Sequence, residues 1–310
     1  MLILGQKYTF TNLELKRLDK KFTNISSIIY QNKIATDAIK EIEQYLNNDK
    51  FTVIVLNTKV KVDNKIIKFL TNLKFNNKFK NIKIIAIEHF LEKYLHKCYI
   101  PEDNTDLHYL DDINKFSKFQ MFQKRTIDYL GISVLYIASF FVMQKCKIKI
   151  KKESKGPIYF KQNRVGYNNK EFECIKFRSM HTDTEFFNHY TQENDPRIFP
   201  WGQKMRKRRY DELPQMLNIL KGDMHLIGPR AEWNELVKGY EEQIPYYNQR
   251  HIVAPGITGW AQVMYPYGAN IEDTKQKLMY DLYYIKHWSL LLELKIVWKT
   301  AMVVLHKKGV

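Results

Sequence analysis

The chain has 310 residues, of which 45% are hydrophobic and 27% are charged. These ordinary globular values exclude a wholly disordered chain and a polytopic membrane protein, and the length suggests two domains. Lys and Arg number 50 against 33 Asp and Glu, a formal net charge of +17, which predicts an anionic partner: nucleic acid, anionic lipid or a phosphorylated substrate. Three scattered cysteines and no CxxC or HExxH motif indicate a reducing, cytoplasmic setting without a zinc site.

The first part of the chain has the pattern of a small α/β domain. Residues 51–56 (FTVIVL) and 82–87 (IKIIAI) are predicted as buried strands, while residues 35–46 and 62–73 carry apolar side chains at helical spacing. Strands that alternate with helices favour a partly parallel sheet.

Glycine is almost absent from this part, because only Gly5 precedes Gly131. A GxGxxG dinucleotide loop therefore cannot occur there. We expect residues 1–115 to form a small Rossmann-like regulatory or docking domain, and residues 116–310 to form a second domain. A polar, acidic linker is predicted at 101–112. Residues 1–10 lack the basic and apolar regions of a secretory signal, so we expect the chain to stay on the cytosolic side.

One segment, residues 127–143, is a membrane candidate, and it is apolar except for Asp128. As a helix it would reach about 25 Å, short of a bilayer core of roughly 30 Å. Basic residues flank it on both sides: Lys118, Lys124 and Arg125 before it, and Lys145, Lys147, Lys149, Lys151 and Lys152 after it. Both ends therefore prefer the cytoplasmic face, which favours a re-entrant or interfacial helix next to anionic lipid headgroups. The alternative is a buried core helix.

Four sequence blocks beyond this segment are rich in side chains that handle phosphate. They are GPIYFKQNRVG (156–166), FECIKFRSM (172–180), MRKRRYDELPQMLNILKGDMHLIGPR (205–230) and PGITGWAQV (255–263). In the third, Pro214 suits only the first turn of a helix, so a helix is expected to begin near Asp211. An acidic pair there is an ordinary helix cap. Four preceding cations also suit phosphoryl transfer, in which carboxylates hold Mg²⁺ or attack phosphorus.

Together, from about Gln123 to the C-terminus, the four blocks resemble the bacterial sugar transferase family. These are the monotopic phosphoglycosyl transferases, or undecaprenyl-phosphate sugar phosphotransferases, and this chain is similar to the larger, exopolysaccharide-type members. The resemblance implies an α+β membrane-associated catalytic domain over residues 116–310, on the cytoplasmic face of the bacterial inner membrane. It also implies transfer of a phosphosugar from a UDP-sugar to polyprenyl phosphate, release of UMP, and Mg²⁺ as cofactor. The product would initiate an exopolysaccharide, capsule or O-antigen.

The resemblance also implies roles for individual residues. Asp211 matches the nucleophile that forms a covalent aspartyl phosphosugar intermediate, and Glu212 matches its partner; both would bind Mg²⁺. The expected phosphate-binding residues are Lys176, Arg178, Arg206 and Arg230. On a strand Lys176 and Arg178 would share one face.

Three features depart from the family pattern. Residues 138–141 (ASFF) contain no Pro, so a re-entrant hairpin would lack its usual cause. Ala231 replaces the second Pro of a common GPRP form. The chain reads MYPYG (264–268) where smaller members carry an Arg, so Tyr265 or Tyr267 could stack on uracil. Asp183 and Glu185 are interpreted as surface carboxylates, and residues 280–305 as an amphipathic helix pair on the core or the membrane surface.

Two other functions were weighed against this one. A basic nucleic-acid-binding protein would need a recognised docking module, and the sequence contains none, so we expect no nucleic-acid partner. A non-catalytic scaffold of the polysaccharide machinery is disfavoured by the intact acidic pair and its cations. A homodimer through either domain is compatible with the sequence.

Overall fold

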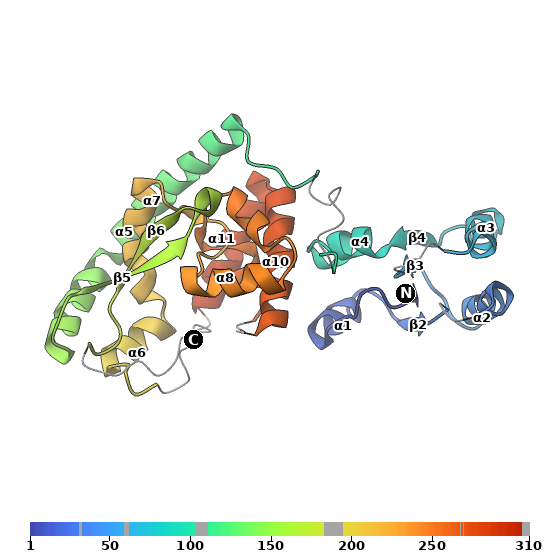
Figure 1. The fold of residues 1–310 in the computed structure, drawn as a ribbon, viewed down its shortest axis with the longest axis horizontal. Helices are drawn as coiled ribbons and strands as arrows, with labels where there is room; N and C mark the ends of the chain where they lie inside the picture. Colours follow the sequence, from blue (N-terminus) through green and yellow to red (C-terminus); the bar gives the residue numbers. More distant parts are fainter. Residues whose placement is uncertain are drawn as a thin grey trace. The chain divides into compact units, whose positions relative to one another are not determined.

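The computed structural model describes residues 1–30, 33–58, 62–102, 111–182, 195–266, 268 and 270–305. The chain divides into two compact units, Met1–Tyr99 and Ile100–Val310 (Figure 1). Unit 2 includes the stretch before residue 116, the expected start of the second domain, and Asp112 in this stretch forms an ion pair with Lys286. Most of the predicted linker lies outside the described residues, as do Asp183, Glu185 and Tyr267.

Unit 1 is built on a four-stranded, fully parallel sheet with the order β2-β1-β3-β4. Its strands are β1 (Leu2–Leu4), β2 (Ser26–Ile28), β3 (Val53–Leu56) and β4 (Lys83–Ala86). Its helices are α1 (Asn12–Leu18), α2 (Ala35–Asn48), α3 (Asn64–Asn72), η1 (Leu73–Phe75), α4 (Ile87–Phe90) and η2 (Leu91–Leu95). The predicted α/β pattern is confirmed, and the sheet is fully parallel where a partly parallel one was expected.

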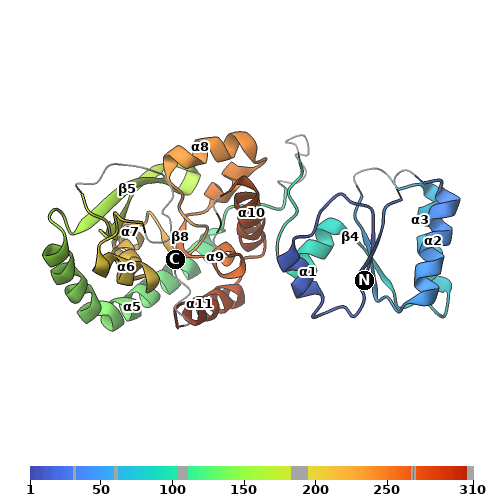
Figure 2. The ribbon, with the colours of Figure 1, turned by 90° about the horizontal axis from the view of Figure 1, so that it is seen from below.

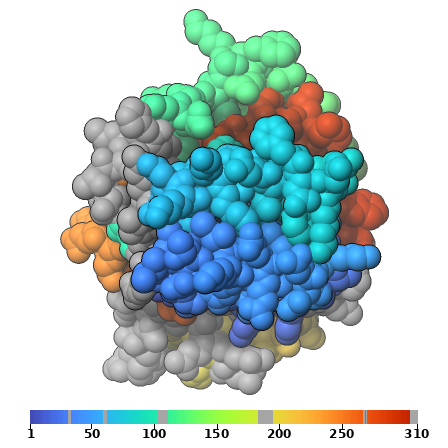
Figure 3. Space-filling model, turned by 90° about the vertical axis from the view of Figure 1, so that its right-hand side faces the viewer, coloured from blue at the N-terminus to red at the C-terminus, as the bar shows by residue number. Residues whose placement is uncertain are grey.

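The helices of unit 1 lie on both sides of this sheet. Figure 2 shows α2 and α3 on one side and α1 on the other, and Figure 3 looks onto the outer surface of α2 and α3. Ala38, Ile42 and Leu46 of α2 pack with Leu4 and Ile54 in one apolar core. Their spacing of four residues places them on one face of the helix, which explains the helical pattern in the sequence.

Gly5, which follows β1, allows a close approach to the residue that follows β3. Gly5 has φ +96° and lies so close to the Asn57 carbonyl that a Cβ would clash with it. The buried Asn57 side chain accepts from the Tyr8 N–H at 2.7 Å and donates to the Tyr8 carbonyl at 2.8 Å. The ends of these two neighbouring strands are thus joined by the chain's own polar groups.

Unit 2 is an α+β structure around one long helix. It contains α5 (Lys118–Glu153), the antiparallel hairpin of β5 (Tyr159–Val165) and β6 (Glu171–Phe177), and the parallel pair β7 (His225–Ile227) and β8 (Gly256–Thr258). The other helices are η4 (Tyr167–Asn169), α6 (Pro200–Lys207), η5 (Tyr210–Gln215), α7 (Met216–Lys221), α8 (Asn234–Gln243), η6 (Tyr247–Ile252), α9 (Trp260–Met264), α10 (Ile271–Lys286) and α11 (Leu290–Leu305). Cys146 and Ile150 of α5 share the core with Phe177, Phe199 and Met205.

The predicted membrane segment is part of α5, which is helical at every residue. Ser117 and Gln120 form a capping box at its start. The helix has no break near Ser139, whose hydroxyl donates to the Leu135 carbonyl at 2.6 Å within the same helix. A re-entrant hairpin requires such a break, and its absence agrees with the missing Pro.

The two ends of α5 are packed, whereas its middle packs on the core through one face, with Ile132 and Leu135, and exposes another face. The N-terminal end buries Lys124 and Asp128, and the C-terminal end buries Cys146 and Ile150. The apolar side chains exposed between them are Tyr129, Leu130, Val134, Tyr136, Ile137, Phe140 and Phe141. Among the described residues, α5 is the one helix long and apolar enough to cross a membrane, and only 17% of its apolar window is buried. The alternative of a buried core helix is therefore wrong.

The C-terminal residues form the predicted helix pair. Leu278, Met279 and Leu282 of α10 are buried in unit 2. In contrast, α11 exposes Leu291, Leu294 and Trp298. The first helix is thus a core element, and the second adds a further apolar surface to that of α5.

Candidate active site

The acidic pair lies in a tight turn at the centre of unit 2. Residues Tyr210–Gln215 form the 3₁₀ helix η5, which follows Arg209 in the left-handed conformation (φ 59°) and leads into α7. The predicted helix near Asp211 is thus present, but as a 3₁₀ turn with Pro214 inside it. With three residues per turn, neighbouring side chains diverge by about 120°. Asp211 and Glu212 therefore face different surroundings.

Glu212 is buried, with 6% of its surface exposed, and it is surrounded by cations. Its Oε1 lies 3.0 Å from Nζ of Lys176 on β6 and 3.5 Å from Nη1 of Arg230, which follows β7. Its Oε2 lies 3.9 Å from Nη1 of Arg209. Burial alone would raise the pKa of Glu212, but Lys176, Arg230 and Arg209 hold it well below its usual range. Glu212 is thus ionised and ties three chain segments together.

Asp211 lacks such compensation. Its Oδ1 is buried without a hydrogen-bond partner among the residues that the structure describes. Burial, together with the neighbouring Glu212 charge, raises the pKa of Asp211, against the opposing attraction of Lys176 and Arg206. Buried polar oxygens almost always have partners, and an exception with a raised pKa marks a candidate functional group.

The structure brings most of the predicted residues together. Asp211, Glu212, Lys176 and Arg230 form one cluster, and the charge of Arg206 on α6 acts on Asp211. Burial lowers the pKa of Lys176, as expected for a cation enclosed by protein. Arg209 is a site residue that the sequence interpretation missed. Its only signal was its place in the basic run before the acidic pair.

Arg178 is placed differently from Lys176. Its guanidinium is buried and donates to the Pro157 carbonyl at 2.6 Å and to the Ser154 carbonyl at 2.8 Å, beyond the C-terminal end of α5. These bonds join the residues after α5 to the end of β6. The phosphate-binding role expected for Arg178 stays a prediction, and its described contacts are those of a structural side chain.

The site also has features that suit a divalent cation. Among the described residues no group of three or more His, Cys, Asp or Glu side chains could hold a metal. Mg²⁺, however, is commonly bound through one or two carboxylates, with water and substrate phosphates completing its shell. The unpartnered Asp211 oxygen beside the ionised Glu212 fits that kind of donor set.

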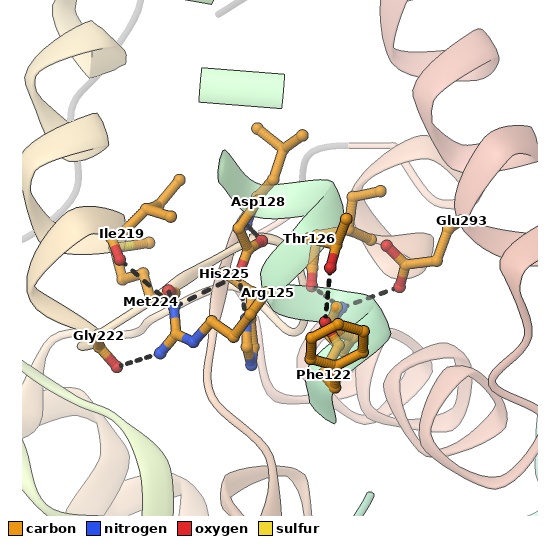
Figure 4. Close-up of polar contacts among 12 residues, drawn as sticks. Phe122, Arg125, Thr126, Asp128, Ile219, Gly222, Met224, His225 and Glu293 are labelled. Atoms are coloured by element: carbon orange, nitrogen blue, oxygen red, sulfur yellow. Dashed lines mark hydrogen bonds and ion pairs between the residues drawn. The ribbon is translucent and has the colours of Figure 1, made fainter. Parts of the chain in front are cut away.

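One turn of α5 holds the elements that carry this site. Arg125 donates to three carbonyls at the C-terminal end of α7: Ile219 at 3.3 Å, Met224 at 3.2 Å and Gly222 at 3.1 Å (Figure 4). The Ile219 carbonyl also accepts from the capping N–H of Gly222, and a cation at a helix C-terminus is favourable. Since α7 follows η5 directly, Arg125 braces the segment that carries the acidic pair.

Two further side chains of the same turn form hydrogen bonds with β7. Asp128 accepts from the Leu226 N–H at 2.7 Å and pairs with Nδ1 of His225 at 2.6 Å (Figure 4). Burial would raise the pKa of Asp128, but this pKa is lowered, chiefly by the bond to His225, and a carboxylate can only accept, so Nδ1 of His225 is the donor. Burial lowers the pKa of the His225 ring. Lys124 donates to the Ile227 carbonyl at 2.9 Å. Because β7 runs into Arg230, this turn also positions the cation beside Glu212.

Lys124 completes a buried polar network with the C-terminal helices. Its Nζ lies 2.9 Å from Oε1 of Glu293 on α11 and 2.7 Å from the Tyr284 hydroxyl on α10, with 1% and 2% of the Lys124 and Glu293 side chains exposed. The sequence interpretation assigned Lys124 and Asp128 to the surroundings of a membrane segment and missed this role. The available signal was the charged pair at the start of an apolar run, whose partners lie far along the chain.

One protein family matches the part of the chain that contains this site. The family model described as bacterial sugar transferase matches residues 119–307. The chain is 46% identical over 191 residues to a UDP-N-acetylgalactosamine-undecaprenyl-phosphate N-acetylgalactosaminephosphotransferase of Aeromonas hydrophila, covering 61% of this chain and 45% of that protein. It is 37% identical over 191 residues to an undecaprenyl-phosphate glucose phosphotransferase of Komagataeibacter xylinus, covering 59% and 36%. The matched segment thus spans less than half the length of these two relatives.

A shorter relative is matched over most of its length. The chain is 38% identical over 186 residues to an exopolysaccharide production protein of Rhizobium leguminosarum bv. phaseoli, covering 57% of this chain and 92% of that protein. The family model match begins at the second residue of α5 and includes η5, β7 and α11.

Proposed function

Since this chain belongs to the bacterial sugar transferase family, we propose that it moves a sugar phosphate from a UDP-sugar to polyprenyl phosphate, releases UMP and so starts a lipid-linked polysaccharide. The names of its relatives support the general reaction. The observation that carries the proposal in this chain is the buried, unpartnered Oδ1 of Asp211 beside a Glu212 whose charge is compensated.

In the first step, a carboxylate oxygen of Asp211 attacks the phosphorus that bears the sugar. A bond forms between the carboxylate oxygen and phosphorus, the bridging phosphorus–oxygen bond of the diphosphate breaks, and its electron pair leaves with UMP. In the second step, a phosphate oxygen of polyprenyl phosphate attacks the same phosphorus and frees the carboxylate. Burial supports this role, because a carboxylate with a raised pKa is a better nucleophile once it is ionised.

The cations around Glu212 supply electrostatic stabilisation. Lys176, Arg230 and Arg209 are held by Glu212, and Arg206 lies within reach of the Asp211 charge. Held in this way, they offset the negative charge that gathers on the phosphoryl oxygens without having to reorganise. Mg²⁺ held by Asp211 and Glu212 would neutralise further charge on the diphosphate. Glu212 thus acts as a positioning residue for the cations.

The geometry of α5 supports an interfacial position in the membrane, and the basic residues on both sides of its apolar segment support the cytoplasmic face of the inner membrane. Both of its ends pack on unit 2, through Lys124 and Asp128 at one end and Cys146 and Ile150 at the other. A helix that crosses the bilayer would separate its ends by the whole membrane. The exposed apolar stretch from Tyr129 to Phe141 is about 20 Å long, shorter than a bilayer core of roughly 30 Å. The active site would then lie at the lipid surface, with unit 1 as a regulatory or docking unit.

The proposal is tested by following nucleotide release from the whole chain. Purified protein with Mg²⁺ and polyprenyl phosphate is incubated with a panel of UDP-sugars that includes UDP-N-acetylgalactosamine and UDP-glucose. We expect one of them to give UMP in equal amount to a polyprenyl diphosphate sugar, measured by chromatography. Release of UDP would contradict the proposal, because it marks transfer of the sugar without its phosphate.

A further inference from the structure

Three lysines converge on one tryptophan at the C-terminal part of α5. The Nζ atoms of Lys145 and Lys149 on α5 and of Lys204 on α6 lie 5.3, 5.8 and 5.9 Å from the centre of the Trp201 ring. Trp201 is held in place because its backbone N–H donates to Oε2 of Glu153 at 2.6 Å. The aromatic ring is thus a fixed platform between two helices, with three ammonium groups around it.

The charges of these lysines are not compensated within the described part of the chain. None of the carboxylates described there forms an ion pair with Lys145, Lys149 or Lys204. Contact with an aromatic face contributes about 0.5–1 kcal/mol for each exposed cation, which leaves the charge in place. Three ammonium groups, each within 6 Å of the centre of one ring, give this part of the surface a local positive charge that attracts an anion.

The cluster lies on the C-terminal side of the exposed apolar stretch of α5 from Tyr129 to Phe141. Phe141 is 83% exposed, Lys145 follows one turn later, and Lys149 follows after another turn. With the exposed face of this stretch in the acyl region, these lysines reach the level of the headgroups, where Trp and Lys side chains are most favourable. A phosphate group at this level and the acyl chains beneath it belong to the same lipid molecule.

We propose that Trp201, Lys145, Lys149 and Lys204 form a binding site for the phosphate headgroup of an anionic phospholipid. The ammonium groups donate to the phosphodiester oxygens, and the acyl chains lie along the exposed face of α5. The lipid is not consumed, so the proposal is separate from the transfer reaction. The bound lipid fixes the depth of α5 in the membrane.

The test compares two triple substitutions of equal charge. In the first, Lys145, Lys149 and Lys204 are changed to Gln. In the control, Lys147, Lys151 and Lys152 of the same basic segment are changed to Gln. Flotation with phosphatidylcholine vesicles, with and without phosphatidylglycerol, measures how much phosphatidylglycerol increases binding. We expect the increase in binding caused by phosphatidylglycerol to be about tenfold smaller in the first variant than in the control.

A substitution of the platform provides an independent variant. Trp201→Leu should also reduce the phosphatidylglycerol-dependent increase, and Trp201→Phe should keep most of it, because an aromatic face is retained. Binding to pure phosphatidylcholine reports whether α5 still enters the bilayer in each variant.

Two results would overturn the site. Equal losses in both triple variants would show that a diffuse basic surface is responsible. An unchanged phosphatidylglycerol effect together with a raised KM for polyprenyl phosphate would assign the cluster to the acceptor instead. Vesicle binding is measured without UMP release. A failure of the proposed transfer reaction would therefore leave the result for the lipid site unaffected.

Discussion

Asp211→Asn abolishes UMP release and at the same time makes the protein more stable at neutral pH. The loss of activity, about 10³-fold or more, follows from removal of the nucleophile. The gain in stability follows from the pKa of Asp211, which burial raises above its unfolded value. Between these two pKa values the folded state binds more protons, so stability falls as pH rises through that window. An amide has no charge to desolvate, and each kcal/mol recovered raises Tm by about 2–4 °C.

The matched control is the neighbouring carboxylate. Glu212→Gln leaves Lys176 and Arg230 without their partner, so it should lower stability by about 2–3 kcal/mol, less than for a fully enclosed pair because both cations are partly exposed. The pKa of Glu212 is depressed, so its stabilising effect is fully present above the unfolded pKa and is lost progressively as the pH falls from the unfolded to the folded pKa. Thermal melts at several pH values compare the variants. If Asp211→Asn were the less stable of the two at pH 7, the assignment of their charges would be wrong.

The second large effect is that of Lys124→Met, which lowers stability by about 3–5 kcal/mol because the buried Glu293 carboxylate loses its counter-charge and keeps only hydrogen bonds from Trp288 and Tyr284. For a unit of this size, Tm should fall by about 10 °C. Glu293→Leu should cost a similar amount, since Lys124 then lacks its counter-charge. Thermal or denaturant melts of the membrane-free or detergent-bound protein give the values.

The double variant separates the ion pair from simple packing. With Lys124→Met and Glu293→Leu together, both charges are removed, and the Tyr284 hydroxyl still donates to the Ile227 carbonyl at 3.1 Å. We expect the double variant to be more stable than either single one, as is common when a buried pair is replaced by apolar residues. Additive losses would show that the two side chains do not interact, and would remove the basis for their role in holding β7.

The sequence predicted the longer elements of unit 1 but missed its first two strands. Helix α2 has an apolar stripe over several turns, and β3 is a dense β-branched run, so periodicity identifies both. In contrast, β1 and β2 have three residues each, too few to show a period. They are strands because β1 pairs with β3 on one side and with β2 on the other, and this pairing depends on distant parts of the chain.

For the site, the motif blocks were enough to select the acidic pair, Lys176, Arg206 and Arg230, but not the contacts of every residue. The two-residue spacing predicted that Arg178 and Lys176 share one face of a strand. In the structure Arg178 lies beyond the end of β6, and its guanidinium donates to the Ser154 carbonyl at the end of α5. Asp128 seemed an interruption of an apolar run, and the structure shows why it is tolerated, because His225 and Leu226 satisfy it. Such partners are far apart in sequence, and no local pattern reveals them.

The central claim is that Asp211 carries the phosphosugar during transfer. It is tested most directly by mass spectrometry of the intact protein after incubation with its UDP-sugar and Mg²⁺, without polyprenyl phosphate, followed by peptide mapping. The account predicts a mass increase equal to one sugar phosphate on the peptide that contains Asp211, together with about one UMP per active chain, and loss of the adduct when polyprenyl phosphate is added. Turnover with no adduct on Asp211, or an adduct on another residue, would contradict it.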